Sequence, residues 1–582
     1  MESDSDVTKD ELEAVEAFAT PAPAKGKDPR RIAASVAIGA GSLALGWPLY
    51  KLLYAQGESD AYMILSIVGM MLMPAFWFVD RRGLVRESRV LLCVLAAFAS
   101  SAVLINGHSQ FFEKRKDHGL FVWNLYHYML GTKYFPEVGY FDLYRASIVA
   151  DDELEKVFQK PGYQIRDMHT YEFIPIEDAL VTAKTEGVRD KFAPDRWENF
   201  KKDLRFFQKL KGGRFWKGPI ADRGFNPSPA WLILHEPILN LAKWRRMPVL
   251  DFLCDLNSYL LLGAILALWW AFGLRVSLIS TLWFCLWFGN DSRVFGGYFA
   301  YDWFVYFIFF ICLAERGWKA AGAPWLAYSA MMRGFTGLVA LHGAVRWVIE
   351  TARRRRLPAE RTRFFLALVA SCMVIVALGS MTGRGFDGWL EWKEKISIHS
   401  ENHTISYNRI GLKFLFSHDY TTGKWVTNIP AIERKFEKNE SKYKAASFAL
   451  MALTLLAMIR RKDHDGYLLF IPFVYFAMML SRYYFSVAVL LFTWREFDRR
   501  GIGSLLSSMW LFFVPAFFHW HQQIDKSHYR NWWWANVQVV AYFLIVIAYF
   551  LVKDARELLA ERRARKAPPP SPTPNNPIAE SA

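Results

Sequence analysis

The sequence has few cysteines and no internal repeat, and we expect no cleavable leader. Its five cysteines all fall inside apolar runs, where a thiol behaves as a small hydrophobic side chain: Cys93, Cys254, Cys285, Cys312 and Cys372. We therefore expect neither a disulfide framework nor a cysteine-ligated metal. The first apolar run, from about residue 31 to 54, lacks a small-residue cleavage site, so we expect it to remain as an anchor. No nucleic-acid module accompanies the net charge of +16, and no nucleic-acid partner is expected.

Apolar and aromatic residues are abundant and are gathered in long blocks. Hydrophobic residues make up 53% of the 582 residues and aromatic residues 16%, with 24 tryptophans. Lys and Arg lie in short clusters between the blocks, such as "DRRGLVRESR", "ARRRRLPAERTR" and "RRKDHD". Long apolar blocks separated by basic clusters are typical of a polytopic membrane protein with basic cytoplasmic loops.

The apolar blocks predict an all-α polytopic membrane protein with about fourteen transmembrane helices, twelve being the lower limit. The expected spans are residues 32–54, 60–79, 88–105, 249–273, 276–289, 299–315, 319–333, 335–350, 364–382, 443–460, 466–480, 482–496, 503–520 and 534–552. Threaded from a cytoplasmic N-terminus, these spans place every basic cluster on one side. The expected location is the bacterial inner (plasma) membrane, with the active face extracytoplasmic.

This threading divides the chain into seven parts. They are a disordered cytoplasmic N-terminus (1–30), N-terminal transmembrane helices (31–105), a large extracytoplasmic loop domain of mixed structure (106–248), a central transmembrane core (249–382), an extracytoplasmic loop (383–442), C-terminal transmembrane helices (443–553) and a disordered cytoplasmic tail (554–582).

The large loop domain contains a predicted amphipathic helix. In "DKFAPDRWENFKKDLRFFQKLKGGRFW" the apolar residues recur every three or four positions: Trp197, Phe200, Leu204, Phe207 and Leu210. The apolar face of this helix either lies in the lipid headgroup layer or packs on the rest of the loop domain.

The same domain begins with the aromatic stretch "WNLYHYMLGTKYFPEVGYFDLY", residues 123–144. Helical spacing would place His127, Gly131 and Tyr134 on one face, with Asp142 and Tyr144 following in a loop. Aromatic faces bind sugars and lipid chains, and carboxylates or imidazoles take protons from hydroxyl groups. The alternative is an interfacial aromatic belt with solvated charges.

Other segments predicted on the outer side carry similar side chains. "GNDSRVFGGYFAYDWF" contains Arg293 and Asp302, and "YSAMMRGF" contains Arg333. Further cations, polar groups and aromatics follow at His399, Glu401, His403, Asn408, Arg409, Arg482 and Tyr484.

Several of these motifs, in this order, resemble the GT-C superfamily of membrane glycosyltransferases. They are the "YHYMLGTKYF" and "GYFDLY" pattern, "FAYDW", "LAYSAMMRGF", the Trp-rich segment leading to "NHTISYNRIGL", and "RYYF". The resemblance covers roughly residues 110 to 500 and is nearest to the bacterial, polyprenyl-phosphate-sugar-dependent, mannosyltransferase-like branch.

The resemblance implies a polyprenyl-phosphate sugar donor reached from the membrane lipids, and a glycan, glycolipid or protein acceptor. A carboxylate would act as general base, and cations would stabilise the departing lipid phosphate. The family's usual base position falls near Asn124, which cannot accept a proton. Asp142, Glu137 or Asp302 would have to supply the base instead.

For the leaving phosphate the expected ligands are Arg333, Arg409 and Arg482, with His403 as a further donor. The other expected substrate-binding residues are His127, Tyr144, Arg293, Asn408 and Tyr484. No cofactor is certain. A divalent metal stays open, because His399, Glu401 and His403 have a spacing that allows chelation from an extended strand.

Two other functions remain as alternatives. A lipid or amphipathic-substrate transporter or flippase would explain the short spans and the arginines. A GT-C-like scaffold that binds lipid-linked glycans without catalysis would explain Asn124.

Overall fold

The structure is a computed structural model that describes residues 29–108, 112, 119–290, 295–401, 409–418, 429–495, 497 and 501–566. Arg293, His403 and Asn408 lie outside the described residues, as do the two predicted disordered ends up to residue 28 and from residue 567. The fold is all-α, with two short antiparallel strand pairs, β1–β2 and β3–β4, in the described part.

Within these ranges, seven helices are long and apolar enough to cross a membrane, which indicates a membrane protein. They are α3 (Glu58–Arg82), α4 (Val85–Asn106), α13 (Met247–Phe272), α18 (Ala359–Gly379), α21 (Ile429–Ile459), α24 (Ile502–Ile524) and α25 (His528–Lys566). Helix α2 (Pro29–Tyr54) precedes them and is bonded to α4, because the Ser101 hydroxyl donates to the Gly46 carbonyl at 3.0 Å.

The remaining predicted spans are shorter helices. A helix rises about 1.5 Å per residue and must cover about 30 Å of hydrocarbon, so these pieces are too short to cross alone in a straight line. The count of fourteen spans therefore stays a prediction. The pieces are α14 (Leu274–Leu286), α15 (Asp302–Glu315), α16 (Lys319–Met332), the 3₁₀ segment η5 (Gly334–Val339), α17 (Ala340–Arg354), α22 (Asp463–Leu468), α23 (Phe470–Ala477) and the 3₁₀ segment η6 (Arg482–Thr493).

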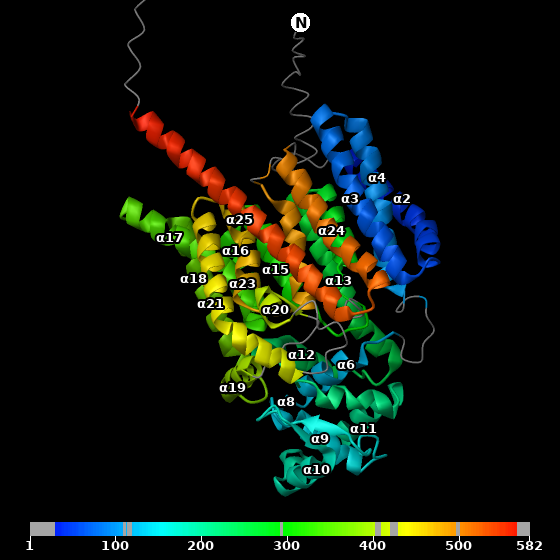
Figure 1. The fold of residues 1–582 in the computed structure, drawn as a ribbon. Helices are drawn as coiled ribbons and strands as arrows, with labels where there is room; N and C mark the ends of the chain where they lie inside the picture. The colour runs from blue at the N-terminus through cyan, green and yellow to red at the C-terminus, as the bar shows by residue number, and fades with distance from the viewer. Residues whose placement is uncertain are drawn as a thin grey trace, which may run out of the picture.

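Many helix ends are joined by ion pairs at one end of the bundle. Arg275 at the start of α14 contacts Asp80 in α3 at 2.6 Å, and Arg495 contacts Glu315 in α15 at 2.5 Å. Asp463 at the start of α22 joins Lys319 of α16 and Arg361 of α18. Figure 1 shows the start of α2 and the end of α25 at this same end, which we call the basic end. The placement of every basic cluster on the cytoplasmic side stays a prediction.

Residues 119–246 form a compact unit at the opposite end, which we call the outer domain (Figure 1). Its elements are α6 (Val122–Leu125), the π-helical turn η1 (Tyr126–Leu130), α7 (Gly131–Lys133), α8 (Phe135–Val138), α9 (Leu143–Asp152), β1 (Gln164–Arg166), β2 (Phe173–Pro175), α10 (Ile176–Thr185), η2 (Val188–Lys191), α11 (Pro194–Leu210), η3 (Gly213–Lys217), η4 (Pro219–Ala221) and α12 (Pro229–Leu241). Two helices from the next polar segment, α19 (Asp387–Glu401) and α20 (Leu412–Ser417), follow α18.

The aromatic stretch 123–144 is the core of this domain. Tyr126, Tyr134, Tyr140 and Tyr144 are all buried, so the alternative of a solvated interfacial belt is wrong. The stretch is helical, as expected, but it contains the π-helical turn. Tyr144 lies inside α9 rather than in a loop, and Asp142 directly precedes that helix.

The predicted amphipathic helix is α11, and its apolar face packs inside the outer domain. Trp197, Phe200, Leu204 and Phe207 are buried, and Phe200 lies edge-on to Tyr134 with ring centroids 5.0 Å apart. Because neighbouring side chains cover this face, α11 does not lie in the headgroup layer.

Candidate functional site

Four cations gather where the outer domain meets the segment after α18. Arg166 ends β1, Arg223 follows η4, Lys395 lies in α19 and Arg409 begins β3 (Arg409–Ile410). We call them the cationic cluster. Burial and the nearby Arg223 lower the pKa of both Arg166 and Arg409, that of Arg409 to about 9. Mutual repulsion of this kind shows that the positive charges are near one another.

Lys395 is the most confined member of the cluster, with 0% of its surface exposed. Its ammonium contacts the Met168 sulfur at 3.0 Å and lies 4.6 Å from the centroid of the Tyr171 ring. Burial first, and Arg166 second, lower its pKa to about 7. Asp222 and Asp167 act against this shift, but no carboxylate among the described residues forms an ion pair with the ammonium. A fully buried lysine of this kind is rare, because desolvation disfavours the charged form.

Tyr171 organises the cluster from the outer domain. Its carbonyl accepts a hydrogen bond from Arg166 Nη1 at 2.7 Å, and its hydroxyl lies 2.9 Å from His399 Nδ1. Its φ of 63° is unusual for a bulky residue. Backbone strain of this kind is frequent at ligand sites, where the surrounding structure holds it in place.

Burial and the nearby Arg223 lower the pKa of His399 to about 3, so the imidazole is neutral at pH 7. In the part of the chain whose side chains are described, no group of three His, Cys, Asp or Glu residues could hold a metal. The Glu401 side chain and His403, the other two residues of the predicted chelate, are outside that part.

Two carboxylates stand beside the cluster: Asp167, which is paired with Arg145 at 2.9 Å, and Asp222. Burial would raise the pKa of Asp222, but His127, a hydrogen bond from Trp123 Nε1 (2.7 Å) and Arg223 lower it instead, so Asp222 is ionised. The short turn from Asp222 to Gly224 also approaches Lys395: a Cβ at Gly224, where φ is +71°, would lie 3.6 Å from Lys395 Nζ.

His127 and Tyr144, both predicted to bind substrate, hold this turn in place. The Gly224 amide donates to the Tyr144 hydroxyl at 2.9 Å, and that hydroxyl lies 2.7 Å from His127 Nε2. His127 Nδ1 lies 2.8 Å from the Trp123 carbonyl. His127 Nε2 also lies 3.1 Å from the Pro219 carbonyl, and burial lowers the pKa of His127.

The structure also brings together Arg333, Arg409, Arg482 and Tyr484 from distant parts of the sequence. Strand β3 pairs Arg409 with Ser481 of β4 (Leu480–Ser481), and Arg482 follows directly. Arg333 donates to the Tyr128 hydroxyl at 2.9 Å and lies 5.7 Å from the centroid of the Tyr484 ring. Arg409 is 7% exposed, and its Nε has no hydrogen-bond partner among the described residues.

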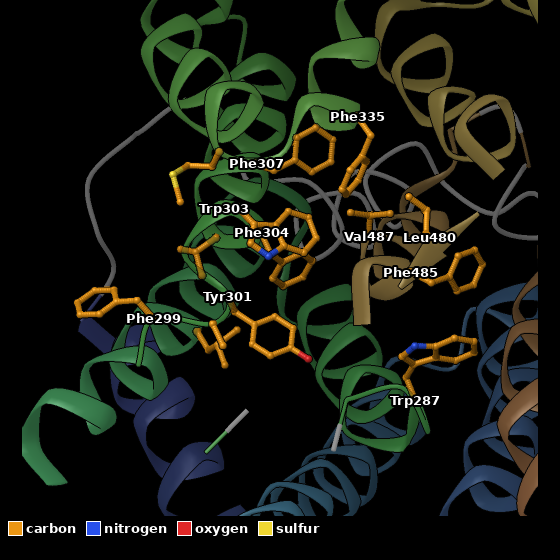
Figure 2. Close-up of a cluster of buried hydrophobic side chains, with 14 of the residues drawn as sticks. Trp287, Phe299, Tyr301, Trp303, Phe304, Phe307, Phe335, Leu480, Phe485 and Val487 are labelled. Carbon is orange, nitrogen blue, oxygen red and sulfur yellow. The ribbon is translucent and has the colours of Figure 1, made fainter. Parts of the chain in front are cut away.

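Asp302, a predicted base, begins α15 and is 1% exposed. Its Oδ1 accepts from the Trp303 amide at 2.6 Å, whereas its Oδ2 has no hydrogen-bond partner in the described part and lies 3.8 Å from His235 Nε2. Figure 2 shows the aromatic cluster around this helix start, where Trp303 lies near Phe304 and Phe335.

Asn124 occupies the position where the resemblance expects a base, and it has a structural contact there. Its side-chain oxygen accepts a hydrogen bond from the Tyr298 amide at 2.9 Å, and Asn257 accepts similarly from Tyr301 at 3.0 Å. These buried amides fix the segment that leads into Asp302.

Glu137 and Asp142, the other predicted bases, are engaged by cations of the outer domain. Arg196 binds both oxygens of Glu137, at 2.6 and 2.9 Å. Asp142 contacts Lys191 at 2.6 Å and Arg145 at 3.9 Å. These contacts occupy the oxygens that would accept a proton.

Sequence reasoning missed Arg166, Asp222, Arg223 and Lys395. One signal was available: Trp392, Lys395 and His399 have the three- and four-residue spacing of one helix face, which puts a lysine on an aromatic side of α19. The approach of β1 and of the Asp222 turn to that face involves long-range packing and has no local signal.

The fold and the site together define an all-α membrane protein with a buried, cation-rich junction between its membrane helices and an outer domain. Comparisons of the chain with protein-family models, with curated proteins and with solved structures find no match.

Proposed function

We propose that the protein is a membrane glycosyltransferase that moves a sugar from a polyprenyl-phosphate donor to an acceptor hydroxyl. The reaction would take place on the face that carries the outer domain. The cationic cluster is the observation that supports this proposal most. Lys395 and Arg409 are buried cations, which require a counter-charge. The two carboxylates described near Lys395 are Asp222 and Asp167, and Asp167 is already paired with Arg145. A phosphate group would supply the missing negative charge.

In this reaction the cluster would bind the donor phosphate and stabilise it as it leaves. Arginine forks suit phosphate oxygens, and an ammonium without a carboxylate contact gains most from a new anion. Lys395, Arg223 and Arg409 would contact the phosphate. Arg333 is a further cation, held by the Tyr128 hydroxyl and lying over the Tyr484 ring.

The acceptor hydroxyl must lose a proton, and Asp302 is the best-placed predicted base. A general base needs a free oxygen within reach of the substrate. The Oδ2 atom of Asp302 makes no hydrogen bond in the described part of the chain, whereas both other predicted bases are occupied by cations. In this proposal Asp302, at the start of α15, takes the proton from the acceptor, and the cations at the junction bind the donor phosphate.

The test uses purified full-length protein in lipid, a labelled polyprenyl-phosphate sugar and an extracted membrane acceptor. Asp302→Asn should keep donor binding and lower transfer by at least about a hundredfold, as expected for loss of a general base. Lys395→Met should weaken donor binding and transfer together. Lys393→Met, at an exposed position of the same helix, is the matched control and should change neither.

Three results would decide against parts of the proposal. If Asp222→Asn abolishes transfer while Asp302→Asn does not, the base is Asp222. If Lys395→Met binds the donor as well as Lys393→Met does, the cluster is not the phosphate site. Binding without transfer in the wild-type protein, with every donor and acceptor tried, would favour the transporter or non-catalytic alternative.

A further inference from the structure

A polar cavity lies far from the cationic cluster, at the basic end of the membrane helices. It is small and partly open, and it is formed by α3, α14, η6 and α24 together with the end of α13. Asp80 and Arg275, which line it, form one of the ion pairs that define the basic end. Neither the outer domain nor the proposed transfer reaction uses this cavity.

The lining is polar on one side and aromatic on the other. Arg275 and Arg495 supply positive charge, Ser504 and Ser508 supply hydroxyls from one face of α24, and Phe76 and Phe272 supply apolar surface. Each arginine also lies over one of these rings, Arg275 at 5.2 Å from the Phe76 centroid and Arg495 at 5.6 Å from that of Phe272. A cavity of this composition fits a ligand that is anionic at one end and apolar at the other.

Both guanidinium groups keep donors available. Arg275 uses Nη1 to bind Asp80, and Arg495 uses Nη2 to bind Glu315. A guanidinium has five N–H donors in a planar fork, so each group can also bind phosphate oxygens. Because each arginine already shares its charge with a carboxylate, the two pairs carry no net charge together, and the site suits a singly charged phosphodiester better than a doubly charged phosphate.

The surroundings of the cavity indicate where this ligand would come from. Phe78 on α3 is 51% exposed, and Ile502 and Leu506 on α24 are 65% and 57% exposed. On candidate membrane-spanning helices, outward apolar residues of this kind face acyl chains. A lipid could therefore enter sideways, with its headgroup at the level of the ion pairs.

We propose that this cavity binds one glycerophospholipid of the adjacent leaflet, with its phosphodiester between Arg275 and Arg495 and its acyl chains against α3 and α24. The site is separate from the proposed donor site and does not depend on the proposed function. The bound lipid would contact α3, α14 and α24 and so stabilise their packing at the basic end.

The test measures lipid retained by the full-length protein in detergent, by native mass spectrometry after titration with phosphatidylglycerol. One molecule should remain bound to the wild type, and uncharged dioleoylglycerol should not. Ser504→Leu with Ser508→Leu fills the cavity without touching either ion pair and should lower retention by about tenfold or more, which corresponds to the loss of a few good contacts. Arg275→Gln and Arg495→Gln should each lower it as well.

Two controls separate this site from general electrostatics and from the donor site. Arg354→Gln, at an exposed arginine of α17 that does not line the cavity, should retain phosphatidylglycerol as the wild type does. Lys395→Met should also retain it. Equal retention by the serine double variant and the wild type would overturn the proposal, as would an equal loss in Arg354→Gln. Retention of polyprenyl phosphate in place of phosphatidylglycerol would overturn the choice of a glycerophospholipid.

Discussion

Charged side chains in the outer domain and at its junction fall into two kinds. Some are paired: Lys133 contacts Asp203 at 2.7 Å, and Arg196 holds Glu137. In the described part of the chain Lys395 is buried without such a bond, and the Oδ2 atom of Asp302 makes no hydrogen bond and lies 3.8 Å from His235 Nε2. In a buried ion pair each charge is stabilised by the opposite charge. A buried charge that has no opposite charge in contact destabilises the fold, and such groups are more frequent at functional sites. This distinction makes Lys395 and Asp302 the stronger candidates for chemistry.

The lowered pKa of Lys395 predicts that donor binding depends on pH. The pKa is about 7, so the ammonium becomes charged as the pH falls through this value and can then attract the phosphate. Affinity for a polyprenyl phosphodiester should therefore rise several-fold from pH 8.5 to pH 6, since a diester does not itself titrate in this range. Lys395→Met should lose most of this dependence, and Lys393→Met should keep it. A fluorescence titration at several pH values in the wild type and both variants measures the effect.

Without bound donor, the free energy of unfolding should fall as the pH falls, whereas donor affinity should rise. In the unfolded chain a lysine titrates near 10.4, so between about pH 7 and 10 the unfolded state binds more protons than the folded state. The penalty for burying Lys395 is complete below pH 7 and fades toward pH 10. Lys395→Met should therefore raise the melting temperature most at pH 6 and least at pH 10. A constant difference across this range would contradict a titrating Lys395.

The ion pair between Glu137 and Arg196 joins helices α8 and α11. Loss of this ion pair should determine how a Glu137 substitution changes the stability of the outer domain. Glu137→Gln and Arg196→Gln should each lower the stability of the outer domain by about 2 kcal/mol, between the values for surface and buried ion pairs. Hydrogen exchange of the α8 and α11 amides would measure the loss. Lys156→Gln, which breaks the exposed pair with Asp152, should have almost no effect.

Sugar transfer by the same variants separates structure from catalysis. If Glu137 only stabilises the fold, both variants should retain similar transfer at a temperature where they are folded. Loss of transfer in Glu137→Gln, with normal transfer in Arg196→Gln, would instead support the catalytic role that the sequence predicts for Glu137.

At the level of elements, sequence periodicity predicts some features well. Helix α11 was expected because its apolar residues recur at helical spacing, and the long spans were expected because their apolar runs are long enough. Helix α19 was missed, because segment 383–442 looks like a polar loop, yet its Trp389 packs on the end of α18 and donates to the Val376 carbonyl at 3.3 Å. Contacts such as those between Trp389 and α18 depend on tertiary packing, which local sequence patterns do not reveal. The same limit applies to the site, where Arg409 and Ser481 are adjacent through strand pairing of segments more than seventy residues apart.

The whole molecule has two chemically different ends. Ion pairs between helix termini gather at the basic end, while the outer domain and the candidate site lie at the other (Figure 1). Basic loops remain on the cytoplasmic side of a membrane. This arrangement therefore predicts that the outer domain faces away from the cytoplasm.

Single cysteines at exposed positions would test this orientation, in a background where the five native cysteines are replaced. Cysteines at Glu155, Lys393 and Lys526 should react with a membrane-impermeant thiol reagent added to intact cells, because these residues are exposed in the outer domain, in α19 and between α24 and α25. Cysteines at Arg354 and Arg562, which are exposed at the basic end, should react only after the membrane is opened. The Lys393 result matters most, since α19 carries Lys395. If Lys393 were labelled only in opened cells while Glu155 was labelled in intact ones, the two could not lie on the same side. The cationic cluster, which needs both α19 and β1, could not then form in the membrane.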